Sequence, residues 1–168
     1  MALENYTDRA KGMIENAQYK AMSLQHQRLL PEHLLAVLLD DGEGMAANLI
    51  RTAGGDAVKV RAANAAALDK LPKVQSSNGA DQLMMSQEMA RLFAQAEEIA
   101  KKSGDSFVTV ERLLLALALT TGTGAADALA KGGVKAEALN QAINELRKGR
   151  TADSAGAEAG YNALKKYA

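Results

Sequence analysis

Apolar residues recur every three to four positions along most of the chain, which is the period of an α-helix, and no stretch alternates as a half-buried strand does. The first half predicts four helices, which start near Thr7, at Pro31, at about Met45 and at Asp56. Thr7 is a residue type that caps helix starts, and Pro31 suits a first helical position because its missing N–H has no intrahelical partner there. The third and fourth helices end at chain breakers, the pair Gly54–Gly55 and Pro72.

The helical pattern restarts after a polar loop over residues 73–82. The fifth helix, closed by Gly104, carries its apolar stripe on Met89, Leu92, Phe93, Ala96, Ile99 and Ala100. Thr109 can cap the sixth helix. The seventh begins at Thr123 or Gly124 and stops at the pair Gly132–Gly133, and the eighth ends before Gly149. The second half therefore also predicts four helices.

The two halves match at one constant offset of 79 residues, without a gap. At this offset "PEHLLAVLL" falls on "VERLLLALA", and the matched pairs include Glu32 with Glu111, Leu35 with Leu114, Ile50 with Leu129 and Gly54 with Gly133. The sequence therefore predicts an all-α domain over residues 1–149, in which eight helices form a tandem, pseudo-twofold repeat of a four-helix unit. Repeat one covers about residues 5–72 and repeat two about 84–149, and packing them together buries the apolar face that each alone would expose.

The last residues have a different composition. From Arg150 to about Gly160 the chain is small and polar without periodicity, and "YNALKKYA" then resembles the start of another element. Residues 150–168 are therefore predicted to be a flexible linker toward a further module.

Composition narrows the class of protein. With 168 residues, 48% apolar and 24% charged, the chain can bury the core of one soluble domain. Basic and acidic residues number 20 each and form no basic stripe, so we expect no nucleic-acid partner. The absence of cysteine excludes disulfides and thiolate metal sites. The longest apolar run, residues 113–119, is too short to cross a membrane, and the first residues lack signal-peptide features, so we expect a cytoplasmic location.

Two stretches invite a chemical interpretation. His26, Glu32 and His33 suggest a metal site or a small hydrolase, but the histidines lack the H-E-x-x-H spacing, so structural roles are favoured. The stretch "TGTG" at 121–124 precedes a helix, yet no phosphate-loop motif occurs, which favours a turn with a cap. A small hydrolase that uses His26, Glu32 and His33 is the alternative of a different functional class.

The second half carries more apolar residues than a small bundle obviously needs. Beside the run at 113–119 stand Met84, Met85, Met89, Phe93, Ile99 and Phe107. Methionine-rich surfaces accept varied partners, although methionine more often fills gaps in a core. A groove that takes apolar segments is one interpretation of this excess.

Three stretches resemble a known family. "YTDRAKGMIENAQYKAMSLQHQRLLPEHLLAVLLDD", "GDSFVTVERLLLALAL" and "RKGRTADSAGAEAGYNALKKYA" are similar to the N-terminal region of the ClpB-type disaggregases, AAA+ stress-response chaperones of the Hsp100/Clp family. The resemblance covers the whole chain. It implies a double-repeat, substrate-engaging domain that transiently binds exposed apolar segments of unfolded or aggregated polypeptide and passes them to the ATP-driven pore of a homohexamer working with an Hsp70 system.

The resemblance also implies what this chain lacks. We expect a monomeric, non-enzymatic fragment with no cofactor, because ATP and Mg would bind in AAA+ modules outside it. The alternative is an adaptor-docking domain of a protease-associated Clp unfoldase, against which the ending "ALKKYA" argues.

The family match assigns site residues. Thr7, Asp105 and Glu111 match polar positions of the family's substrate-binding surface, and the apolar lining is expected from Phe93, Ile99 and Phe107. From the residues alone, Thr7 is interpreted as a helix cap, Asp105 as a turn residue, and Glu111 as a favourable charge in the first turn of a helix. The sequence departs from the family at Leu30, which replaces a capping Thr, and at Gln95 and Arg112, which stand near expected lining positions.

Overall fold

The structure, a computed structural model, describes residues 3–41, 44–74 and 83–157. Within these ranges repeat one contains α1 (Asp8–Ser23), α2 (Pro31–Asp40), α3 (Met45–Thr52) and α4 (Ala57–Asp69). Repeat two contains α5 (Gln87–Lys102), α6 (Val110–Leu119), α7 (Gly124–Lys131) and α8 (Ala136–Arg147). The predicted all-α double repeat is confirmed, and the helix starts match the capping residues that the sequence indicated. Most of the predicted loop at 73–82 lies outside the described residues.

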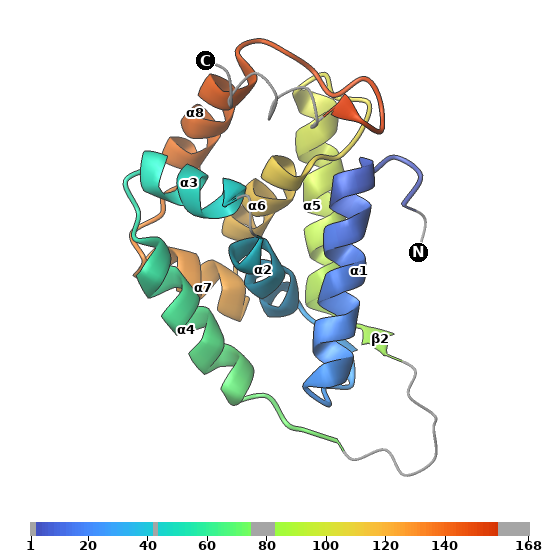
Figure 1. Cartoon of the computed structure of the whole chain (residues 1–168), viewed down its shortest axis with the longest axis vertical. Helices are drawn as coiled ribbons and strands as arrows, with labels where there is room; N and C mark the ends of the chain where they lie inside the picture. The colour runs from blue at the N-terminus through green and yellow to red at the C-terminus, as the bar shows by residue number, and fades with distance from the viewer. Residues whose placement is uncertain (1–2, 42–43, 75–82, 158–168) are drawn as a thin grey trace.

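The two repeats pack against each other chiefly through helices that do not correspond in sequence order. α2 and α6 lie at the centre, α1 and α5 run along one side, and α3, α4, α7 and α8 form the other (Figure 1). α1 packs on α2 as α5 packs on α6, while α4 contacts α7 and α3 contacts α8 across the repeats. The central leucines have less than 2% of their surface exposed; they are Leu34, Leu35, Leu38, Leu113, Leu114 and Leu117. Burial of these side chains places the centre of the hydrophobic core on α2 and α6, one helix from each repeat.

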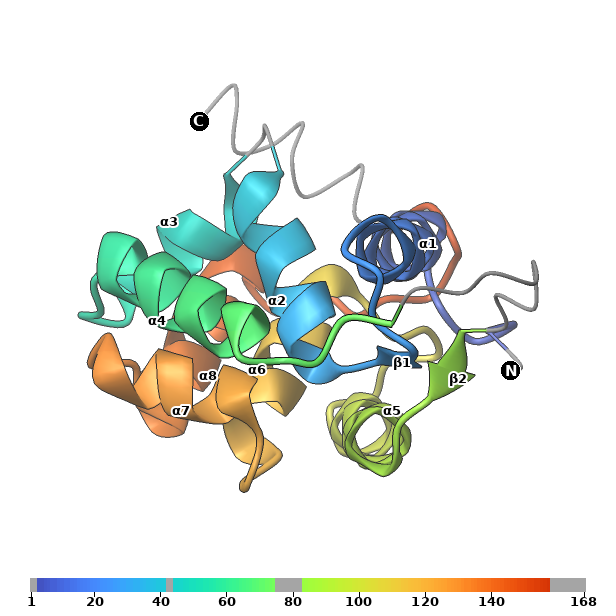
Figure 2. The same ribbon diagram turned by 90° about the horizontal axis from the view of Figure 1, so that it is seen from below.

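Short backbone pairs hold the two repeats together at their turns. β1 (Arg28–Leu29) pairs in parallel with β2 (Met84–Met85), and Tyr6 forms an isolated parallel bridge with Val108. Leu29 and Val108 are 79 residues apart, as are Tyr6 and Met85, so the two pairs are pseudo-symmetric copies. The β pair lies between α1 and α5 (Figure 2). The expectation that the chain has no strand is corrected here, because a two-residue strand is too short to show alternation.

The first part of the expected linker is held against the domain. The N–H groups of Ser106 and Phe107 donate to the Ala152 carbonyl at 2.9 and 3.1 Å, and the Asp8 N–H donates to the Ala155 carbonyl at 2.9 Å. Ala152 is completely buried. The prediction of a loose chain from residue 150 is therefore wrong for residues 150–157, and the packed domain extends past residue 149. The remaining residues of that prediction, 158–168, lie outside the described ranges.

No single helix within the described ranges is long and apolar enough to cross a membrane.

The starts of α2 and α6 differ in their caps. Thr109 accepts the Arg112 N–H at 3.4 Å, whereas the equivalent Leu30 has no side-chain oxygen. The backbone N–H of Leu30 is nevertheless satisfied, because it donates to His33 Nδ1 at 3.0 Å. In a reciprocal cap, each of two residues accepts the backbone N–H of the other. At the start of α2 the His33 side chain accepts the Leu30 N–H, but the Leu30 side chain cannot accept an N–H of the first turn.

We predict that Leu30→Thr raises the free energy of unfolding by about 0.5–1 kcal/mol, because the hydroxyl can accept an N–H of the first turn. Leu30→Val is the matched control, since valine has the shape of threonine without the hydroxyl. Urea denaturation of both variants measures the difference. A threonine variant no more stable than the valine variant would show that Leu30 contributes by packing and that no cap is missing.

Candidate functional site

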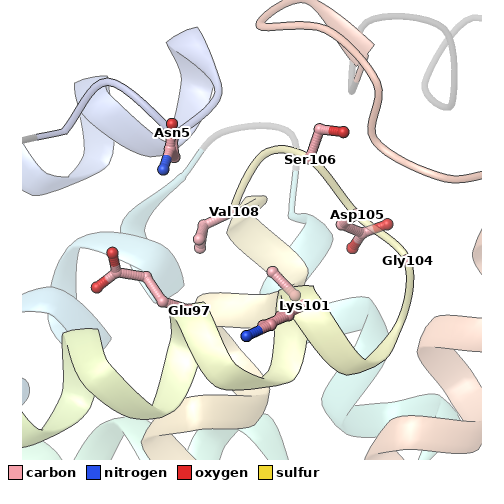
Figure 3. A pocket seen from close by; sticks show the side chains of 8 residues that line it. Asn5, Glu97, Lys101, Gly104, Asp105, Ser106 and Val108 are labelled. Atoms are coloured by element: carbon pink, nitrogen blue, oxygen red, sulfur yellow. The ribbon is translucent and has the colours of Figure 1, made fainter.

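An open depression of about 490 Å³ lies where the two repeats meet, between the start of α1, the last turns of α5 and the turn that leads into α6. Its lining residues are Asn5, Glu97, Ala100, Lys101, Gly104, Asp105, Ser106 and Val108. Glu97 and Lys101 project from α5, and Asn5 stands across from them (Figure 3). We call this depression the seam groove.

The seam groove is built on paired backbone. The Val108 N–H donates to the Asn5 carbonyl at 2.7 Å and the Thr7 N–H donates to the Val108 carbonyl at 3.0 Å. Ala100 and Val108 supply apolar surface, while Glu97 and Lys101, both exposed, place one charge of each sign at the rim. Within the described ranges no group of three His, Asp or Glu residues is arranged to hold a metal ion. The arrangement suits weak contact with a chain of mixed chemistry.

Asp105 anchors the turn beside the groove. Its carboxylate receives Arg147 Nη1 at 2.6 Å, Arg112 Nε at 3.2 Å and the Ala152 N–H at 3.0 Å. The side chains of all three charged residues are at most 5% exposed. Burial alone would raise the pKa of Asp105, but these hydrogen bonds and the Arg147 charge outweigh it and hold the pKa below its ordinary value. This carboxylate joins the turn, α6, α8 and the C-terminal segment.

Glu111 lies in the same interior cluster, which consists of Asp105, Glu111, Arg112 and Arg147, but its carboxylate has fewer partners than that of Asp105. It is completely buried, and its Oε1 stands 3.7 Å from Arg147 Nη2, which instead donates to the Thr109 hydroxyl at 2.8 Å. Neither carboxylate oxygen has a hydrogen-bond partner of normal geometry among the described residues. Burial raises the pKa of Glu111, and the Arg147 charge offsets only part of that effect.

The structure gathers the polar residues that the family match assigned, but it buries them. Thr7 is completely buried, and its hydroxyl accepts the Ala10 N–H at 3.1 Å as a helix cap. Asp105 and Glu111 belong to the interior cluster, and of the three only Asp105 lines the groove. The expectation that these side chains form an exposed anchor is corrected, because Thr7 caps α1 and both acids are packed in the interior beside Arg147. Arg112, expected near the surface, is buried for the same reason.

The apolar site residues divide into two kinds. Phe93 is 6% exposed and packs edge-to-face on Tyr6, with ring centres 5.9 Å apart, so it belongs to the core. Ile99 and Phe107 are half-buried and adjoin groove residues in sequence. Sequence reasoning missed Asn5, Glu97, Lys101 and Ser106 as groove residues. The spacing of Glu97 and Lys101 by one helical turn on α5 was the available signal.

His26 and His33 occupy the positions equivalent to Asp105 and Arg112. Their rings are joined by a hydrogen bond of 2.8 Å between His26 Nδ1 and His33 Nε2. Because His33 Nδ1 accepts the Leu30 N–H, His33 carries its proton on Nε2 and donates it to His26. Glu32 does not join this pair; its Oε1 accepts the Ala125 N–H at 3.2 Å. The three residues of the hydrolase alternative therefore do not converge on one reacting centre.

Comparisons with known proteins agree with this architecture. The family model of the Clp repeat (R) N-terminal domain matches residues 5–131, so the chain belongs to the Clp N-terminal repeat family. Over all 168 residues it is 56% identical to chaperone protein ClpB of Mesorhizobium japonicum and 55% identical to that of Rhizobium meliloti. The chain spans 19% of the length of these relatives, to whose N-terminal region it is similar.

Solved structures show the same fold. The Hsp104 N-terminal domain of Candida albicans matches with a TM-score of 0.76 at 24% identity, covering 90% of this chain and 97% of that one. The N-terminal domain of the ClpV1 ATPase of E. coli matches with a TM-score of 0.66 at 22% identity, covering 83% of each chain. At this identity the likeness extends to the fold alone.

We predict that Asp105→Ala lowers the free energy of unfolding by about 3–5 kcal/mol, because it leaves two buried guanidinium groups without their carboxylate. Asp153→Ala, the loss of an exposed carboxylate, is the matched control. Equal urea midpoints for the two variants would contradict a stabilising role for the cluster.

Acid should weaken the fold through the histidine pair. Burial, followed by the charge of His26, lowers the pKa of His33 to about 4. An unfolded histidine takes up a proton near pH 6.5, so between these values the unfolded state binds more protons and stability falls as pH falls. We expect wild type to lose about 2 kcal/mol between pH 7 and pH 5 through this group. Urea denaturation of His33→Gln should show a shallower loss; an identical pH dependence would refute the assignment.

Proposed function

We propose that this chain is the polypeptide-engaging N-terminal domain of a ClpB-type disaggregase, with the seam groove as its binding surface. The observation that carries the proposal is the match to chaperone protein ClpB over every residue of the chain, C-terminal segment included. In the proposed assembly the domain captures exposed apolar segments of unfolded or aggregated polypeptide in the cytoplasm. It then passes them to the ATP-driven pore of a homohexamer that works with an Hsp70 system.

The geometry of the seam groove favours transient capture. Its floor is formed by Ala100 and Val108, which are 4% and 2% exposed, and half-buried Ile99 and Phe107 adjoin it in sequence. The depression is open and its exposed rim charges are screened by salt, so binding is weak. Weak binding suits a module that must release its substrate to a pore, while attachment to the ring raises the local concentration of substrate.

The buried acids serve this function indirectly. Asp105 fixes the turn over residues 104–108, which supplies half of the groove lining. Glu111 and Arg147 lie behind that turn. In this proposal the residues that contact polypeptide are Asn5, Glu97, Lys101 and Ser106, and the cluster keeps them in place. The chain itself is proposed to be an accessory module without enzymatic activity.

A bulky side chain in the groove should block binding. We predict that Ser106→Trp, a change at an exposed groove residue, weakens binding of reduced, carboxymethylated α-lactalbumin by about tenfold or more, because the indole fills the depression. The matched control is Ser23→Trp. Ser23 lines a second depression of about 570 Å³ between α1 and α2. NMR titration of the labelled chain gives both the affinity and the residues that respond.

Each outcome of this titration decides something. Loss of binding in Ser106→Trp alone supports the seam groove, and loss in Ser23→Trp alone moves the site to the second depression. Absence of binding to wild type overturns the proposal and favours the adaptor-docking alternative, in which a folded partner is the ligand.

A further inference from the structure

Residues 152–155 are bound to the domain almost entirely through their backbone. The Ala152 carbonyl accepts the N–H groups of Ser106 and Phe107, and the Ala155 carbonyl accepts the N–H of Asp8 in the first turn of α1. The Ala152 N–H donates in turn to the Asp105 carboxylate. Three protein N–H groups and one buried carboxylate thus form a site for main chain. The occupant is a segment of this same chain, which bends at Ser154 and turns over residues 155–156.

The site imposes one demand on side chains. Ala152 is completely buried, whereas Thr151, Asp153 and Ser154 are exposed. A segment that follows the same path, with a small residue at the buried position and a bend two residues later, could therefore make the same hydrogen bonds. Recognition of main chain with little demand on sequence is how extended peptides bind when many different sequences must be accepted.

The backbone site adjoins the seam groove. Ser106 lines the groove, and its N–H is one of the donors to Ala152. The C-terminal segment passes beside Ser106 and Asp105 at the groove edge (Figure 3). Asp8 follows Thr7 at the start of α1, where Thr7 pairs with groove residue Val108. A polypeptide that extended from the groove past Ser106 would meet donors that the segment already holds.

We propose that residues 152–155 act as a built-in competitor that occupies the backbone-binding edge of the seam groove, so that full engagement of a polypeptide requires this segment to leave. The proposal rests on the function proposed above. Apparent affinity then falls by the fraction of molecules in which the site is free; if about 10% are free, polypeptide binds about tenfold more weakly than to the vacated site.

The segment also connects the site to the rest of the domain. Asp105, which receives the Ala152 N–H, is paired with Arg147 in the last turn of α8, and residues 148–151 connect that helix to the segment. Release of the segment removes one of the hydrogen bonds that Asp105 accepts but leaves both of its arginine partners. The turn and the groove can therefore persist when the segment is undocked.

Ala152→Leu should release the segment, because the buried position has no room for a larger side chain. Ser154→Leu is the matched control, since it adds a leucine two residues away at an exposed position. In Ala152→Leu the amides of Asp8, Ser106 and Phe107 should exchange with solvent about tenfold faster or more. The affinity for reduced, carboxymethylated α-lactalbumin should rise by about tenfold. A synthetic peptide of residues 150–157 should bind Ala152→Leu, restore protection of the three amides and compete with the unfolded protein. Ser154→Leu should behave as wild type in every measurement.

Two failures are distinguishable. Faster amide exchange in Ala152→Leu with unchanged affinity for the unfolded protein overturns the competition but leaves the proposed function intact. No binding of unfolded protein to wild type or either variant overturns the proposed function and this inference with it. If Ala152→Leu loses its cooperative melting transition, a protease site inserted after exposed Gly149 replaces it. Cleavage of the folded chain should then produce the same gain in affinity, and unchanged affinity after cleavage and removal of the released peptide overturns the inference.

Discussion

The buried carboxylate of Asp105 is the interaction on which this end of the molecule depends. It draws together the turn after α5, Arg112 of α6, Arg147 of α8 and the backbone of Ala152. A buried charge is stable only when it is paired and fully hydrogen-bonded, and here three donors meet that requirement. Because one carboxylate on the turn satisfies donors from three other segments, the shape of the seam groove and the docking of the C-terminal segment are consequences of the same pairing.

The two repeats keep one backbone and differ in their interior chemistry. Gln25 has a φ of 62° and the equivalent Gly104 a φ of 79°, so both turns use the left-handed conformation. The residues that follow are a hydrogen-bonded histidine pair in repeat one and an acid with two arginines in repeat two. A neutral pair and an ionic cluster thus stabilise the same turn. The ionic cluster also binds a segment of main chain, because Asp105 accepts the Ala152 N–H. Within the described residues, the rings of His26 and His33 do not bind a corresponding segment in this way.

A groove at the junction of two repeats has properties that neither repeat has alone. Asn5 comes from repeat one, whereas Glu97, Lys101 and Ser106 come from repeat two, and the Tyr6–Val108 bridge fixes their relative positions. The proposed substrate surface therefore exists only while the repeats remain packed. The proposed competition adds a second condition, since the edge of that surface is shared with residues 152–155. Capture and release would then be governed by a few backbone hydrogen bonds, whose individual net contribution is about 1 kcal/mol.

The sequence by itself determined the helices, their caps and stops, and the constant offset between the repeats, because periodicity, capping and the left-handed glycines are local properties. It also indicated that packing of the two repeats buries their apolar faces, and the leucines of α2 and α6 are buried, apart from Leu119. Only the tertiary structure decided that Asp105 and Glu111 are interior, since their partner Arg147 stands 42 residues beyond Asp105. The same holds for the segment after α8: its small polar composition predicts a loose linker, but the donors that hold it come from residues 8 and 105–107. Burial and pairing depend on which distant segments meet, and no local pattern records that meeting.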